Sequence, residues 1–91
     1  MITNKEIEKW VDDSIRYTVE CIYRISEEKR LSPFKKENYG QFYKYLHGHV
    51  NVDVPLITTI LKNWIFMKAK YQDDFGKPIL MIKLPECNIS E

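Results

Sequence analysis

The spacing of apolar residues changes within residues 54–84, and this change constrains the fold more than any other feature of the chain. Up to Trp64 the apolar residues recur at helical spacing, whereas from Met67 to Gln72 apolar and polar residues alternate as in a half-buried strand. An acidic turn containing glycine, residues 73–77, precedes a second apolar run from Pro78 to Leu84. The pattern therefore predicts a helix that leads directly into a β-hairpin, and with it an α+β fold.

Length and composition indicate a single globular domain, residues 1–91. The chain is 44% hydrophobic and 30% charged, which is typical of a folded protein rather than a disordered one. No apolar run approaches the roughly 20 residues that cross a bilayer. Acidic residues also stand near the N-terminus, where a signal peptide would be apolar. We therefore expect a cytoplasmic protein with no membrane partner.

Residues 1–31 are predicted to form one long helix. Thr3 and Glu6 match a capping box, and neither glycine nor proline follows before Pro33. A helix of about 27 residues is about 40 Å long, more than a small core can cover. Either the helix breaks, or its surplus apolar face packs against a second copy, and we favour a homodimer. The expected interface consists of Trp10, Tyr17, Val19, Cys21 and Tyr23.

Residues 36–65 are predicted to form two further helices joined by a short turn. The second helix carries apolar residues at helical spacing, namely Tyr39, Phe42, Tyr43 and Leu46. Gly48 is expected to end this helix. Asp53 is expected to cap the third helix, with Pro55 in its first turn, where a missing backbone donor costs nothing.

The order helix, helix, turn, helix, hairpin resembles that of winged helix-turn-helix domains. Residues 58–71 resemble the recognition helix and first wing strand of MarR-type regulators, and residues 79–84 resemble their second wing strand. The acidic turn keeps a looser form of the usual Asp-x-Arg pair of the wing, and the C-terminal dimerisation helix of that family has no counterpart. The resemblance, which extends to small virus and mobile-element proteins, implies a winged helix with its wing at 66–84 and a tail at 85–91.

A winged helix would place two sets of polar residues against double-stranded DNA. The recognition helix turns one face to the core and the other to the major groove, where threonine, lysine and asparagine can contact phosphates and base edges. The wing would contact phosphates without reading sequence. We therefore expect a transcriptional regulator that binds DNA through Thr58, Thr59, Lys62 and Asn63 on the helix and Lys68, Lys70, Gln72 and Lys77 on the wing.

Two alternatives remain open at this stage. Residues 35–84 carry eight lysines and four acidic residues. This excess of positive charge is smaller than is usual for a domain that depends on phosphate contacts. Lysines on an exposed hairpin also protect against edge-to-edge aggregation. The fold could therefore serve as a protein-binding module or inhibitor that does not bind DNA. Alternatively, Ile65–Tyr71 could continue the third helix into an all-helical bundle, which would remove the wing.

Catalysis, cofactors and metals are not expected. No nucleophile has a matching base, and no glycine-rich phosphate loop is present. His47 and His49 lack further ligands nearby in the sequence. Cys21 reads as a small buried hydrophobe and Cys87 as a free thiol, although a bridge between them or across a dimer stays open.

Overall fold

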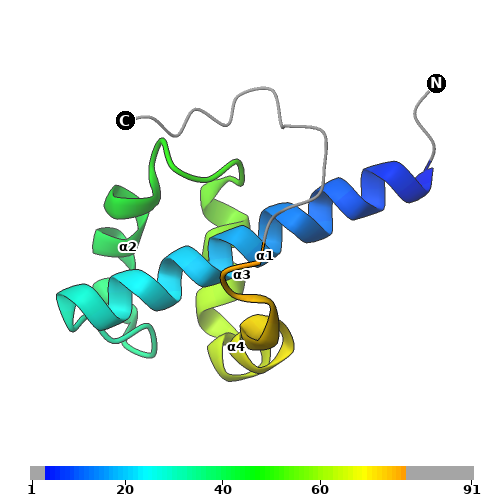
Figure 1. The fold of residues 1–91 in the computed structure, drawn as a ribbon. Helices are drawn as coiled ribbons and strands as arrows, with labels where there is room; N and C mark the ends of the chain where they lie inside the picture. The colour runs from blue at the N-terminus through cyan, green and yellow to red at the C-terminus, as the bar shows by residue number, and fades with distance from the viewer. Residues whose placement is uncertain (1–3, 78–91) are drawn as a thin grey trace.

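The computed structural model describes residues 4–77, which form helices and connecting turns and contain no strand. The long helix α1 crosses the whole molecule, and the shorter helices pack along it (Figure 1). The elements in chain order are α1 (Asn4–Lys29), η1 (Lys36–Asn38), α2 (Tyr39–Leu46), α3 (Val54–Lys62), α4 (Trp64–Tyr71) and η2 (Gln72–Asp74), where η denotes a 3₁₀ helix. None of the helices in this range combines the length and the apolar character needed to cross a membrane.

The α+β prediction is wrong, because the expected first wing strand forms α4 and the start of η2. Trp64, Met67 and Tyr71 are spaced i, i+3, i+7, so all three lie on one helical face, and all three belong to or pack against the core. Residues 66–72 contain no β-branched residue, whereas Met, Ala, Lys and Gln favour helix. The expected second wing strand, Pro78–Leu84, and the tail at 85–91 lie outside the described residues.

Helix α1 runs without interruption for 26 residues, so the alternative of a break is wrong. It ends at Arg30, which adopts a left-handed conformation with φ 53°. The backbone N–H of Leu31 then donates to the carbonyl of Ser26 at 3.2 Å, as at many helix C-termini. The first turns of α1 project beyond the other helices (Figure 1), and this leaves Ile7 and Val11 about half exposed.

The boundaries of α2 and α3 follow the residues that the sequence singled out. Gly48, with φ 83°, follows the end of α2. The Asp53 carboxylate accepts a hydrogen bond from the backbone N–H of Leu56 at 3.2 Å, and Pro55 occupies the first turn of α3. Helical geometry is lost at Asn63 (φ −114°, ψ 36°), so α3 and α4 are two helices rather than one continuous one.

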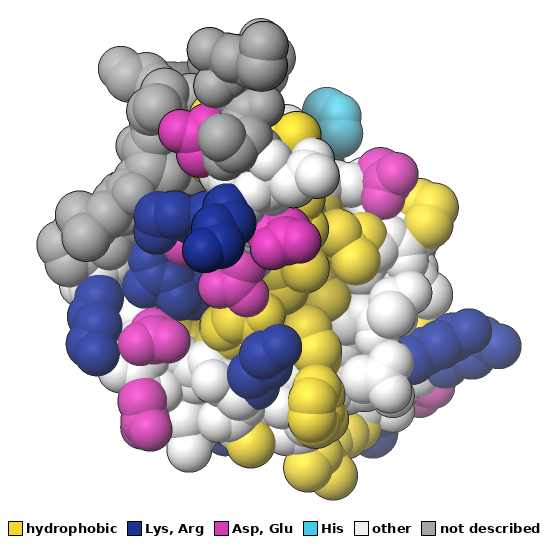
Figure 2. All heavy atoms as spheres, turned by 90° about the vertical axis from the view of Figure 1, so that its right-hand side faces the viewer, with side chains coloured by type: hydrophobic (Ala, Val, Ile, Leu, Met, Phe, Trp, Pro, Cys, Tyr) yellow, Lys and Arg dark blue, Asp and Glu magenta, His cyan; other side chains and the backbone are white. Residues whose placement is uncertain are grey.

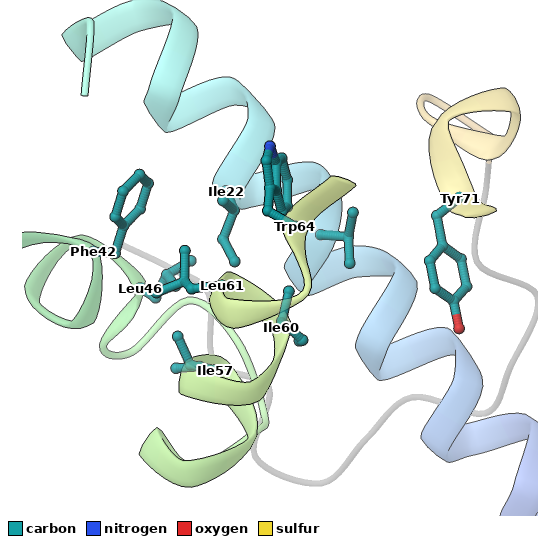
Figure 3. Close-up of a cluster of buried hydrophobic side chains, with 9 residues drawn as sticks. Ile22, Phe42, Leu46, Ile57, Ile60, Leu61, Trp64 and Tyr71 are labelled. Carbon is teal, nitrogen blue, oxygen red and sulfur yellow. The ribbon is translucent and has the colours of Figure 1, made fainter. Parts of the chain in front are cut away.

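All four α-helices contribute to one hydrophobic core. Figure 3 shows its side chains converging where α2, α3 and α4 pack against α1. Burying a large apolar side chain contributes about 1.5–3 kcal/mol, so this cluster dominates the stability of the fold. Its members are Val19, Ile22, Phe42, Leu46, Ile57, Ile60, Leu61, Trp64 and Tyr71.

Polar contacts attach α4 and η2 to α1. They come from α1 residues spaced four apart, which lie on one side of the helix. We call this set the polar seam. Its hydrogen bonds run from Tyr71 Oη to Asp12 Oδ1 (2.8 Å), from Arg16 Nη1 to the Asp74 carbonyl (3.0 Å) and from the Gly76 backbone N–H to Glu20 Oε1 (3.2 Å).

Candidate interaction surface

Three of the four side chains expected to read DNA, those of Thr58, Thr59 and Asn63, are hydrogen-bonded within the protein, and the fourth, Lys62, is exposed. The hydroxyl of Thr58 is bonded to the Val54 carbonyl at 2.9 Å and to the hydroxyl of Tyr43. The hydroxyl of Thr59 donates to the carbonyl of Pro55 at 3.0 Å, and the amide of Asn63 donates to the carbonyl of Thr59 at 2.8 Å. Most of these bonds go to backbone carbonyl groups of the helix itself. The side chains would have to exchange or share them before they could bond to the edges of DNA bases.

The lysines expected on the wing also have partners in the molecule. The Lys68 ammonium lies 5.1 Å from the ring centroid of Tyr23, and that of Lys70 lies 5.3 Å from the ring centroid of Tyr71. Lys77 pairs with Asp74 at 3.4 Å. Gln72, also expected on the wing, is exposed. Without a hairpin these residues are spread over α4, η2 and the turn that follows η2, instead of following one strand.

The outer side of α4 leaves two adjacent large apolar residues in solvent. Ile65 is 74% exposed and Phe66 is 65% exposed, the highest values among the large hydrophobic residues of the described chain. Ala69, Lys70 and, at the end of α3, Lys62 are exposed as well. We call these five residues the α4 outer face. The sequence pattern missed it because residues 64–66 were read as the junction between a helix and a strand.

A second apolar surface is an open groove between the start of α1 and the turn that joins α2 to α3. Its volume is about 700 Å³. Its polar lining residues are Ser14, Asn51 and Asp53. Its apolar lining residues are Ile7, Trp10, Val11, Val50, Val52 and Leu56. The sequence signal for this groove was the length of the first helix, which exceeds what a small core can cover.

Hydrophobic side chains on the side of the molecule seen in Figure 2 form a band that runs from its middle toward its lower edge. Figure 1 places α4 at that lower edge. Among the described residues on this side, acidic side chains lie beside the basic ones along the band (Figure 2). An apolar band with charges of both signs is more typical of a protein-contact surface than of one that follows phosphates.

The residues expected at a dimer interface are distributed over different environments. Val19 is wholly buried in the core and offers no surface to a second copy, so its placement at the interface is corrected. Trp10 lines the groove, and Tyr17 is half-buried on α1. Cys21 lines a smaller hollow of about 350 Å³ between α1 and α2, and Tyr23 packs on Phe75 with ring centroids 5.4 Å apart.

The pKa of one side chain in the polar seam departs from its ordinary value. Burial, followed by the hydrogen bond and the charge of Asp12, raises the pKa of the Tyr71 phenol above 10.0. The phenol therefore stays protonated and acts as a donor at neutral pH. Its contact is structural, because it joins α4 to α1 within the core.

The described residues contain no group of three or more histidine, cysteine, aspartate or glutamate side chains placed to hold a metal ion. His47 and His49 are both exposed. Comparisons with protein-family models, with curated proteins and with solved structures return no match to this chain.

Proposed function

We propose that this chain is a protein-binding domain and that the α4 outer face is its contact surface. The observation that carries the proposal is the exposure of Ile65 and Phe66, side by side on an eight-residue helix whose other large apolar residues are buried or half-buried. Adjacent exposed apolar side chains mark interaction sites more often than isolated ones do. An aromatic anchor beside an aliphatic residue is also typical of interface hot spots.

The charge around this surface defines the chemistry of the partner. From Val54 to Gln72 the chain carries three lysines and no acidic residue. Lys70, one turn after Phe66 on the same helix, is exposed, and so is Lys62 at the end of α3. A matching protein surface has an apolar pocket for Phe66 and carboxylates at its rim. Such complementary charges favour association and orient the partner.

DNA binding through α3 stays a prediction. It differs from a protein contact in the residues on which it depends and in its response to salt. It would depend on Lys62 and Asn63, and it would weaken steeply between about 50 and 200 mM salt through counterion release. A contact centred on Ile65 and Phe66 would respond little to salt, because apolar burial is not screened.

The experiment places a photo-crosslinking phenylalanine at position 66 of the full chain and, as a matched control, at position 34. Phe34 is 62% exposed and lies in the connection between α1 and η1, outside the α4 outer face. In extracts of the source cells we expect discrete adducts from position 66 that disappear with Ile65→Ser. The purified adduct partner should bind wild-type protein with little salt dependence.

Duplex DNA is titrated in parallel at the two salt concentrations. Salt-sensitive binding that is lost with Lys62→Ala and unaffected by Phe66→Ser would overturn the proposal in favour of DNA binding. Adducts from position 34 equal to those from position 66 would also overturn it. Circular dichroism of each variant confirms that the helices are retained.

A further inference from the structure

The groove and the α4 outer face are complementary in shape. The groove is a concave apolar surface whose walls include Trp10, Val11 and Leu56. The α4 outer face is convex, with Ile65 and Phe66 as its most exposed side chains. A groove of about 700 Å³ can accommodate two side chains of this size.

The two surfaces are also complementary in charge. Asp53 is the one charged residue among the described residues that line the groove. The adjacent first turns of α1, residues 4–14, carry four acidic residues and two lysines, an excess of two negative charges. Within this segment Asp13 pairs with Lys9 at 3.6 Å and Asp12 accepts the Tyr71 hydrogen bond. The α4 outer face carries Lys62 and Lys70. The groove thus has the apolar and acidic character that the proposed partner of α4 requires.

Both surfaces can be used at the same time, because they lie at opposite ends of α3. The groove includes Leu56 in the first turn of α3, and the α4 outer face starts at Lys62 in its last turn. The whole of α3 is nine residues, or about 13 Å, long, so the two surfaces adjoin its two ends. One copy therefore cannot seat its own Phe66 in its own groove without giving up the fold, whereas a second copy can.

We infer that a second copy of this chain is a partner of the α4 outer face, with Ile65 and Phe66 of one copy seated in the groove of another. The inference rests on the proposed function, since it names one partner for the same surface. The contact joins two different patches, so it produces either a reciprocal dimer or a head-to-tail chain of copies. In both arrangements each copy contributes one apolar pair and one groove.

The experiment measures the mass of the full chain in solution over a concentration series by analytical ultracentrifugation. We expect the wild-type mass to rise above that of a monomer. Phe66→Ser removes the apolar anchor and Val11→Lys obstructs the groove. Each should weaken association by about tenfold or more, as expected for interface hot spots. Both positions are exposed, so both variants should retain the fold.

The decisive step mixes the two variants. Phe66→Ser keeps an intact groove and Val11→Lys keeps an intact apolar pair, so the mixture should form a one-to-one complex that neither variant forms alone. Phe34→Ser is the matched control, because it removes an equally exposed phenylalanine and should associate as the wild type does. Lys62→Glu should weaken association by a smaller factor, since exposed charge pairs contribute little.

Three results would overturn the inference. A wild-type chain that stays monomeric throughout the series excludes a second copy as partner. If crosslinking at position 66 nevertheless yields a discrete adduct with a different protein, the proposed function stands and this inference alone fails. Association that is lost with Phe66→Ser but unchanged by Val11→Lys excludes the groove. A mixture of Phe66→Ser and Val11→Lys that stays monomeric would exclude the seating of the apolar pair of one copy in the groove of another.

Discussion

Helices α3 and α4 are nearly equal in length and similar in apolar content, yet they place their apolar residues differently. α3 directs Ile57, Ile60 and Leu61 into the core. α4 buries an aromatic residue at each end and leaves Ile65 and Phe66 in solvent between them. The sequence of α3 is thus explained by the stability of the fold, whereas the sequence of α4 is explained only in part by it.

The two helices are also held in different ways. α3 starts with a side-chain cap from Asp53 and a proline in its first turn, and its stability comes from local signals and core packing. α4 has no side-chain cap at Asn63. It is held by its buried aromatic residues and by the polar seam to α1. The contrast indicates that α3 serves mainly to form the hydrophobic core, whereas α4 also exposes apolar side chains that a partner can contact.

The largest expected effect comes from Ile60→Ala in α3. Ile60 is fully buried, so its truncation removes apolar burial and leaves a cavity. We expect the free energy of unfolding to fall by about 2–5 kcal/mol, measured by urea denaturation followed by circular dichroism. A loss below about 1 kcal/mol would contradict the assignment of α3 to the core.

The cap of α3 should contribute less. Asp53→Ala removes the acceptor for the Leu56 backbone N–H and should lower the free energy of unfolding by about 1 kcal/mol. Asp53→Asn keeps an acceptor and serves as the matched control, expected to recover most of that loss. Equal losses in the two variants would show that the cap stabilises the helix through its negative charge at the helix N-terminus and not through the hydrogen bond.

In α4, Tyr71→Phe tests the polar seam. The change removes the hydrogen bond to Asp12 and keeps the buried ring, so the expected loss is about 1 kcal/mol at neutral pH. Because the pKa of Tyr71 is raised in the folded chain, the unfolded phenol ionises first. Its contribution is therefore complete below about pH 10 and declines as the pH rises toward the folded pKa.

That pH dependence can be measured by urea denaturation at increasing alkaline pH. The difference in unfolding free energy between wild type and Tyr71→Phe should shrink above about pH 10. A difference that stays constant across this range would show that the phenol ionises equally in the folded and unfolded chains.

The smallest effect is expected for Ile65→Ala. Its side chain is mostly in solvent, so the free energy of unfolding of the monomer should change by less than about 0.5 kcal/mol, measured as for Ile60→Ala. The pair Ile60→Ala and Ile65→Ala thus compares the two helices with the same chemical change. Similar losses in both would mean that Ile65 is packed in solution, and the contrast between α3 and α4 would not hold.

The sequence predicted most of the helical boundaries because local physical signals determine them. The long α1, the end of α2 at Gly48 and the cap at Asp53 all follow from residues that act within one or two turns. The wing prediction was wrong because the alternation at residues 67–72 is too short to exclude a helix. In that segment Met67 and Tyr71 are four apart, which suits a helical face as well as a strand face.

The candidate surface was harder to predict, because exposure depends on which helices pack where. Ile65 and Phe66 are typical core residues by type, and only the packing of α4 through Trp64 and Tyr71 turns them outward. The groove needs residues 7–11 of α1 and residues 50–56, which are far apart in the sequence, to lie together. The surplus length of α1 indicated that part of its apolar face stays uncovered, but the second wall of the groove could not be inferred.

The polar seam also places different requirements on the residue types of α1 and on those of the segment that α1 binds. Arg16 and Glu20 are required as side chains, but the atoms they bind, the carbonyl of Asp74 and the N–H of Gly76, belong to the main chain. Position 74 can therefore change its side chain without losing the bond to Arg16. Position 76 differs, because Gly76 adopts φ 86°, a conformation that residues with a side chain rarely adopt, so its own backbone geometry restricts it to glycine.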